Sequence, residues 1–113
     1  MREIKFRAWF EKFKEMYTVK MIDLQKGIAY FDKYNYRSFY DIDLMQYTGL
    51  KDKNEKEIYE GDIVIHHSKM YKIIFNAEEA RFVLRNDEFE LEIPFTNNNN
   101  KRMEVVGNIY ENP

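Results

Sequence analysis

The alternation of apolar and polar residues along short segments constrains the fold of this chain more than any other feature. Residues 4–9 read Ile-Lys-Phe-Arg-Ala-Trp. A period of two places alternate side chains on opposite faces of a β-strand. Ile4, Phe6 and Ala8 are therefore predicted to face a core, with Trp9 on the polar face.

Similar segments recur along the chain. One near the C-terminal end alternates Phe89, Leu91 and Ile93 with Glu88, Glu90 and Glu92, which predicts a strand with one solvated face. Other short runs, rich in β-branched and aromatic residues, cover 16–22, 27–31, 63–65, 70–75, 81–84 and 105–110. These segments predict about eight mostly antiparallel strands.

Polar connections separate the predicted strands, at 11–15, 23–26, 76–79, 86–87 and 97–100. A short helical turn is expected within 41–46, because Asp41 or Asp43 can cap its free amides. A second one is expected at 78–81. The chain has no internal repeat and no linker rich in Pro, Gly or Ser, so it is predicted to form one compact all-β domain over residues 1–113.

Composition narrows the class of protein. The 113 residues include no cysteine, so disulfides, thiolate metal sites and catalytic thiols are excluded. Lys and Arg number 18 and Asp and Glu number 20, a net charge of −2. No apolar run approaches the roughly 18 residues of a membrane span, and residues 1–5 lack the apolar stretch of a signal peptide. We expect a cytoplasmic protein without a cofactor.

Charge and aromatic residues are unevenly distributed. Residues 1–40 hold nine basic and five acidic side chains, a net charge of +4, which leaves −6 for the remainder. The same residues hold 11 of the 19 aromatic side chains. Tyrosine suits contact surfaces, because its ring packs while its hydroxyl stays hydrogen-bonded. The irregular segment that contains Tyr34, Tyr36, Arg37 and Tyr40 is therefore the candidate interaction surface.

Long motifs carry a resemblance to a known family. Residues 44–54 read Leu-Met-Gln-Tyr-Thr-Gly-Leu-Lys-Asp-Lys-Asn, and residues 57–64 read Glu-Ile-Tyr-Glu-Gly-Asp-Ile-Val. Together with the two ends, 2–9 and 105–113, they resemble the YopX family of small proteins encoded by phages and prophages. The resemblance implies an all-β fold and a mobile-element origin. It implies no activity and no catalytic or binding residues.

The motif residues have a structural interpretation. Gly49 and Gly61 can adopt backbone conformations closed to other residues, and Asp62 can accept hydrogen bonds from neighbouring amides. The functional alternative is a site beside this turn. Glu55 departs from the family pattern, which usually has glycine there, so a looser loop is expected in place of a tight turn with positive φ.

No catalytic constellation is visible. His66 and His67 adjoin each other, and adjacent strand residues point to opposite faces, so they are not expected to converge on a metal. The three glutamates at 88, 90 and 92, and the pair Asp41 and Asp43, match solvated carboxylates better than acid–base pairs. Gly-x-Ser-x-Gly and glycine-rich phosphate loops are absent from the sequence. We expect neither an enzyme nor a metal protein.

Three functions stay open. The leading prediction is a non-enzymatic β module that binds a protein, either a second copy of itself in a homo-oligomer or a host or phage protein. The second is a nucleic-acid-binding module that uses the basic, aromatic N-terminal third. The remotest is an endoribonuclease, because residues 61–64 resemble a strand entry in the SH3-like barrels of PemK toxins.

Overall fold

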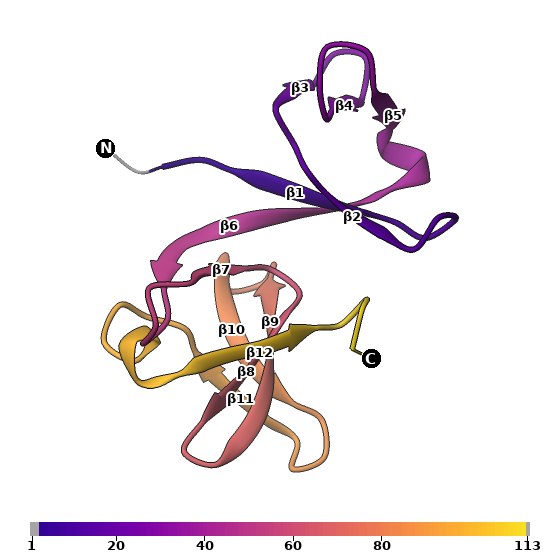
Figure 1. Cartoon of the computed structure of the whole chain (residues 1–113). Helices are drawn as coiled ribbons and strands as arrows, with labels where there is room; N and C mark the ends of the chain where they lie inside the picture. The colour runs from indigo at the N-terminus through magenta and orange to yellow at the C-terminus, as the bar shows by residue number, and fades with distance from the viewer. Residues whose placement is uncertain (1–2, 113) are drawn as a thin grey trace. The chain divides into compact units, whose positions relative to one another are not determined.

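The computed structural model describes residues 3–112 and confirms the predicted all-β class (Figure 1). Its strands are β1 (Phe6–Phe10), β2 (Glu15–Thr18), β3 (Met21–Asp23), β4 (Ile28–Tyr30), β5 (Tyr36–Ser38), β6 (Asp43–Lys51), β7 (Glu57–Tyr59), β8 (Asp62–His66), β9 (Lys69–Asn76), β10 (Arg81–Asn86), β11 (Leu91–Pro94) and β12 (Glu104–Asn108). Two short 3-10 helices are η1 (Phe39–Asp41) and η2 (Asn100–Arg102). Among the described residues, no helix is long and apolar enough to cross a membrane. Arg2 and Pro113, at the two ends of the YopX resemblance, lie outside the described residues.

The chain divides into two compact units, Met1–Gln46 and Tyr47–Pro113. We call them the N-terminal and C-terminal units. Strand β6 begins in the first unit, where it pairs with β1, and ends in the second, where it pairs with β7. A single domain over 1–113 stays a prediction.

Two antiparallel groups of strands build the N-terminal unit. In one, β1 lies between β2 and the first part of β6, and in the other the order is β3-β4-β5 (Figure 1). Its buried cluster consists of Ala8, Phe10, Ala29 and Ile42, with the half-buried Tyr17, Val19, Phe31, Phe39 and Leu44 packed against it. Aromatic and small side chains thus share this core.

The predicted alternation at residues 4–9 is only partly correct. Ala8 is fully buried, as predicted, but Ile4 is 65% exposed and precedes β1, and Phe6 is only half-buried. Trp9, predicted on the polar face, is also buried. Both faces are covered at the end of this central strand, so the period of two does not hold there.

The predicted helical turn lies earlier in the chain than 41–46. η1 spans Phe39–Asp41, and Ser38 caps it by accepting a hydrogen bond from the Tyr40 amide at 3.2 Å. Asp43 belongs to β6, where pairing with Trp9 of β1 supersedes local capping preference. The helical turn predicted at 78–81 is instead a hairpin loop.

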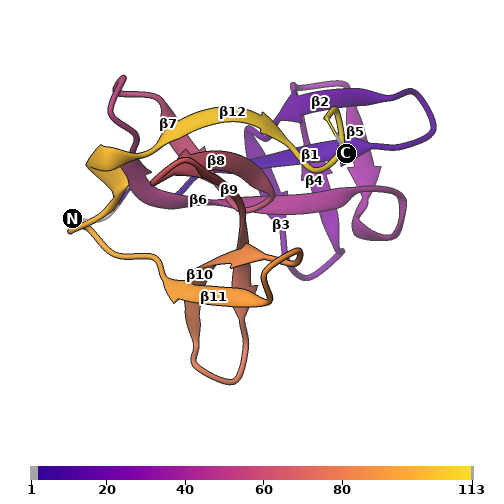
Figure 2. The ribbon, with the colours of Figure 1, turned by 90° about the horizontal axis from the view of Figure 1, so that it is seen from below.

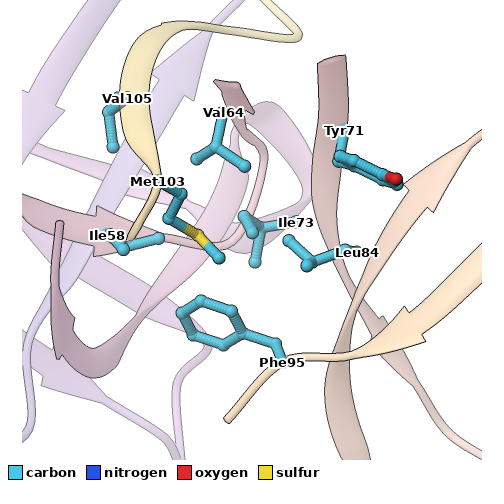
Figure 3. Packing of buried hydrophobic residues seen from close by; sticks show 8 residues of the cluster. All are labelled: Ile58, Val64, Tyr71, Ile73, Leu84, Phe95, Met103 and Val105. Carbon is cyan, nitrogen blue, oxygen red and sulfur yellow. The ribbon is translucent and has the colours of Figure 1, made fainter. Parts of the chain in front are cut away.

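The C-terminal unit is an antiparallel sheet in the order β11-β10-β9-β8-β12. η2 lies between β11 and β12 in the chain. Its buried cluster consists of Ile58, Val64, Tyr71, Ile73, Leu84, Phe95, Met103 and Val105 (Figure 3). These side chains come from five strands and the segments beside them, and only the hydroxyl of Tyr71 points away from the others (Figure 3).

Hairpin loops of four residues account for several of the tight connections. They are 11–14, 77–80 and 87–90, and their last residues, Lys14, Ala80 and Glu90, all have positive φ. The loops that join β9 to β10 and β10 to β11 lie at opposite ends of the sheet (Figure 2). The predicted strand over 88–93 is therefore wrong in its first half, where Glu88, Phe89 and Glu90 form a loop.

The family-signature residues hold backbone in place, as their structural interpretation predicted. Gly49 has φ +90° at a bulge in the pairing of β6 with β7, and Gly61 has φ +88° before β8. The buried Asp62 accepts a hydrogen bond from the Tyr59 amide at 2.7 Å. These contacts explain the signature by backbone geometry.

Glu55 adopts the conformation that the sequence analysis judged strained. Its φ is +64°, and its amide donates to the Asp52 carbonyl at 3.0 Å, which closes a tight turn. The expected looser loop is therefore wrong. The Asp52 carboxylate compensates, because it accepts hydrogen bonds from the amides of Asn54 and Lys56 within the same loop.

We expect Glu55→Gly to raise the free energy of unfolding by about 0.5–1 kcal/mol, because glycine relieves the left-handed strain but gains freedom in the unfolded chain. Glu55→Ala keeps the Cβ atom and is the matched control. Urea unfolding measures both variants. Equal stabilities of the two variants would contradict the assignment of strain to this turn.

Candidate functional site

A row of exposed side chains crosses the three-stranded sheet of the N-terminal unit. Met21 of β3 pairs with Tyr30 of β4, which pairs with Tyr36 of β5. Directly opposed residues share one face of a sheet. Met21 is 56% exposed and Tyr36 52%, whereas the neighbouring row contains the fully buried Ala29. The outer face of this sheet is therefore apolar and open to solvent.

A hollow of about 430 Å³ adjoins this row and is lined by Lys20, Met21, Tyr30, Asp32 and Lys33. We call it the Lys20–Lys33 hollow. A second hollow of about 310 Å³ shares Lys20 and Asp32 and is also lined by Tyr17 and Phe31, whose rings stack at 4.5 Å. Both volumes lie near the lower end of the range found for ligand pockets.

The electrostatic balance of the Lys20–Lys33 hollow is positive. Asp32 accepts hydrogen bonds from the amides of Tyr34 and Asn35 and from the Asn35 side chain. The Asn35 side chain, followed by the Tyr34 amide, lowers the pKa of Asp32. Among residues 3–112, Lys20 and Lys33 form no ion pair. Two uncompensated ammonium groups thus flank an aromatic surface.

The four residues of the candidate interaction surface lie in different surroundings and do not form a single patch. Tyr36 lies in the exposed row, and its ring is 5.5 Å from that of Tyr30. Tyr34 is 79% exposed beside the hollow residue Lys33, whose ammonium lies 5.5 Å from the Tyr34 ring centroid. Arg37 instead alternates to the other face and packs 4.8 Å from the Phe10 ring.

Tyr40 is fully exposed in η1 and belongs to neither hollow. Sequence reasoning did not assign Lys20, Met21, Tyr30 and Lys33 to this surface. Their common position follows from the pairing of β3 with β4 and of β4 with β5. No local sequence pattern indicates that register, because the strands are only three residues long.

A larger concave region lies in the C-terminal unit and has a volume of about 500 Å³. Its cations are already paired: Lys72 Nζ lies 2.7 Å from Asp87 and Arg85 Nε lies 2.8 Å from the same carboxylate. These hydrogen bonds lower the pKa of Asp87, and the bond that Arg85 donates to Asp87 raises the pKa of Arg85. This groove therefore offers less uncompensated charge than the Lys20–Lys33 hollow, in spite of its size.

His66 and His67 lie closer together than the strand alternation predicted. β8 ends at His66, and His67 and Ser68 form a two-residue turn with φ values of +51° and +65°. The ring centroids of the two histidines are 4.1 Å apart. Burial, followed by the charges of His67 and Arg102, lowers the pKa of His66. Within residues 3–112, no three potential ligands of the His, Asp and Glu types gather in a metal-binding arrangement.

The comparisons with known proteins identify the family. The family model described as YopX protein matches residues 5–113. The chain belongs to the YopX family. Its fold is similar to that in the crystal structure of protein EF1440 from Enterococcus faecalis, with a TM-score of 0.76 and 28% sequence identity over 100% of this chain and 97% of that chain. No curated protein matches the sequence closely enough to count as a relative.

Within this YopX protein, the long signature and the candidate site occupy different units. Residues 47–64 of the signature belong to the C-terminal unit, and the Lys20–Lys33 hollow belongs to the N-terminal unit. The signature residues are engaged in turns and bulges, whereas the hollow presents exposed side chains. The candidate binding surface is therefore formed by residues outside the long family signature.

Proposed function

We propose that this YopX protein is a non-enzymatic β module that acts by protein contact. The observation that carries the proposal is the row of the exposed Met21, the half-buried Tyr30 and the exposed Tyr36 beside the Lys20–Lys33 hollow. Aromatic and methionine side chains are enriched where proteins bind each other. Lys20 and Lys33, which form no ion pair with any described residue at the edge of this row, favour a partner segment that carries carboxylates.

The biological setting is part of the same proposal. A phage or prophage origin and action in the bacterial cytoplasm accord with the YopX family resemblance and the absence of cysteine from the sequence. The partner is a second copy of the chain or a host or phage protein.

Affinity capture from a bacterial lysate tests the proposal, with the full chain as bait and nucleic acids digested. Tyr36→Ser removes the most exposed ring of this row, and we expect it to reduce the captured partner by about tenfold, a loss of about 1.4 kcal/mol of binding. Tyr40→Ser is the matched control, since Tyr40 is more exposed but lies outside the row. Capture that is equal for both variants would contradict the proposed surface.

A nucleic-acid-binding function is the second candidate, favoured by the same lysines beside Tyr30 and Tyr36. Aromatic rings that stack on bases and cations that contact phosphates are the physics of single-strand binding. Fluorescence anisotropy with labelled single-stranded DNA and RNA at two salt concentrations tests it. Salt-sensitive binding that Lys20→Ala weakens and Lys26→Ala does not would support this candidate. No binding at low salt would eliminate it.

The endoribonuclease alternative rests only on the resemblance of residues 61–64 to a strand entry in the SH3-like barrels of PemK toxins. Fold by itself does not determine function. An RNA-cleavage assay with the purified chain tests this alternative directly. Turnover that survives repurification would replace the proposal of a non-enzymatic module.

A further inference from the structure

The C-terminal unit carries an exposed loop whose chemistry complements the Lys20–Lys33 hollow. Phe89 lies third in the four-residue loop 87–90 between β10 and β11, and its side chain is 54% exposed. Glu88 and Glu90 flank it on both sides. Among the described residues, Glu88 forms no ion pair. We call residues 87–90 the Phe89 loop.

Hydrogen bonds hold the Phe89 loop in one conformation. The buried Asn86 accepts a hydrogen bond from the Phe89 amide at 2.9 Å and donates one to the Met70 carbonyl at 2.9 Å. The Glu90 amide donates to the Asp87 carbonyl at 3.3 Å, and Glu90 has φ +52°. A loop ordered before binding loses little conformational entropy when it docks. Phe89 is therefore presented by an ordered loop between two carboxylates, with the Lys69 ammonium 5.7 Å from the centroid of its ring.

We infer that the Phe89 loop of one copy docks into the Lys20–Lys33 hollow of a second copy. The phenyl ring contacts Met21 and Tyr30, and the flanking carboxylates approach the ammonium groups of Lys20 and Lys33. This inference rests on the proposed function, because it names the partner of the same surface. Each copy carries one loop and one hollow.

The charges on the two surfaces favour a second copy over nucleic acid as the occupant. The lining of the hollow carries the two ammonium groups of Lys20 and Lys33 and only one carboxylate, that of Asp32. This carboxylate accepts hydrogen bonds from amides of its own loop. The Phe89 loop supplies carboxylates for the two lysines of the hollow and an aromatic ring that can pack against Met21 and Tyr30. Opposite charges at the edge of an apolar contact accelerate association and select the register of docking.

Light scattering and sedimentation of the full chain over a wide concentration range provide the first test. We expect the mass to rise with concentration and the association to weaken with salt. Glu88→Lys is expected to weaken association by about tenfold, which corresponds to 1.4 kcal/mol. Glu78→Lys is the matched control, because Glu78 is the second residue of the equivalent loop 77–80.

A charge exchange between two variants provides the second test. Lys33→Glu and Glu88→Lys are each expected to associate weakly alone. A mixture of the two is expected to recover association, because the reversed charge in the hollow of one variant then faces the reversed charge in the loop of the other. Lys26→Glu, a change at an exposed lysine outside the hollow, leaves both native surfaces intact and is expected to associate as the unmodified chain does.

The outcomes separate this inference from the proposed function. A chain that stays monomeric at the highest concentration, or equal effects of Glu88→Lys and Glu78→Lys, would overturn docking between copies. Capture of another protein that depends on Tyr36 would then still support the proposed function. A chain that stays monomeric and binds a single-stranded oligonucleotide at the hollow would overturn the inference in favour of the nucleic-acid function.

Discussion

Asp52→Asn is expected to lower the free energy of unfolding by about 2–3 kcal/mol, although the two side chains have nearly the same shape. Asp52 is 2% exposed. One carboxylate oxygen accepts hydrogen bonds from the amides of Asn54 and Lys56, and the other accepts one from the Val105 amide at 2.9 Å. Asparagine would place an NH₂ donor against one of these amide donors, which leaves a buried N–H group unsatisfied.

The same residue predicts an acid-sensitive step in stability. Burial alone would raise the pKa of Asp52, but hydrogen bonds from the amides of Val105, Lys56 and Asn54 outweigh it and lower the pKa. The native carboxylate therefore binds a proton more weakly than the unfolded chain, whose Asp pKa is about 3.9. The stabilisation is present above that pH and is lost as the pH falls through the lowered native pKa.

Urea unfolding at neutral pH and at decreasing pH measures both effects. The acid-dependent loss should be smaller in Asp52→Asn than in the unmodified chain, since the titrating group is gone. Asp87→Asn is the control, because Asp87 also accepts charged hydrogen bonds but lies at the surface, where solvent screens them. An unfolding midpoint that changes equally in both variants would contradict the structural role of Asp52.

Leu84→Ala is expected to lower the free energy of unfolding by about 3 kcal/mol, since truncation of a buried leucine leaves a cavity. Leu84 is fully buried in the cluster of the C-terminal unit, next to Ile73 and Phe95 (Figure 3). Chemical denaturation followed by circular dichroism measures the loss.

Leu24→Ala is the matched control for this prediction. Leu24 is 82% exposed, so its truncation should change the free energy of unfolding by less than about 0.5 kcal/mol. A small effect of Leu84→Ala, similar to that of Leu24→Ala, would show that the cluster in Figure 3 does not stabilise the protein.

The sequence was most informative where local chemistry decides the conformation. Predicted strands at 63–65, 70–75 and 81–84 fall within β8, β9 and β10, because β-branched and aromatic residues suit a pleated, partly buried surface. Asn86 and Asp87 correctly indicated a connection, which Asn86 stabilises by accepting a hydrogen bond from the Phe89 amide. The strand number was less accurate, because run 16–22 covers parts of two strands, β2 and β3, and no run was predicted for β5, β6 or β7.

Errors arose where distant pairing supersedes local preference. Asp43 can cap a helix but lies in β6, because that segment pairs with β1. Glu55 and Glu90 adopt positive φ in tight turns, although neither residue type favours it. His67 leaves the strand and brings its ring to His66, which alternation alone excluded.

The sequence by itself determined the all-β class, the turn-forming residues and the family, because these depend on neighbours along the chain and on a long motif. Only the tertiary structure decided which aromatic and basic side chains form a surface. Met21, Tyr30 and Tyr36 lie in one row because β3, β4 and β5 pair in one register. Arg37, the next residue after Tyr36, lies on the opposite face of the same sheet. Register depends on contacts between strands, so it is not encoded in any single segment.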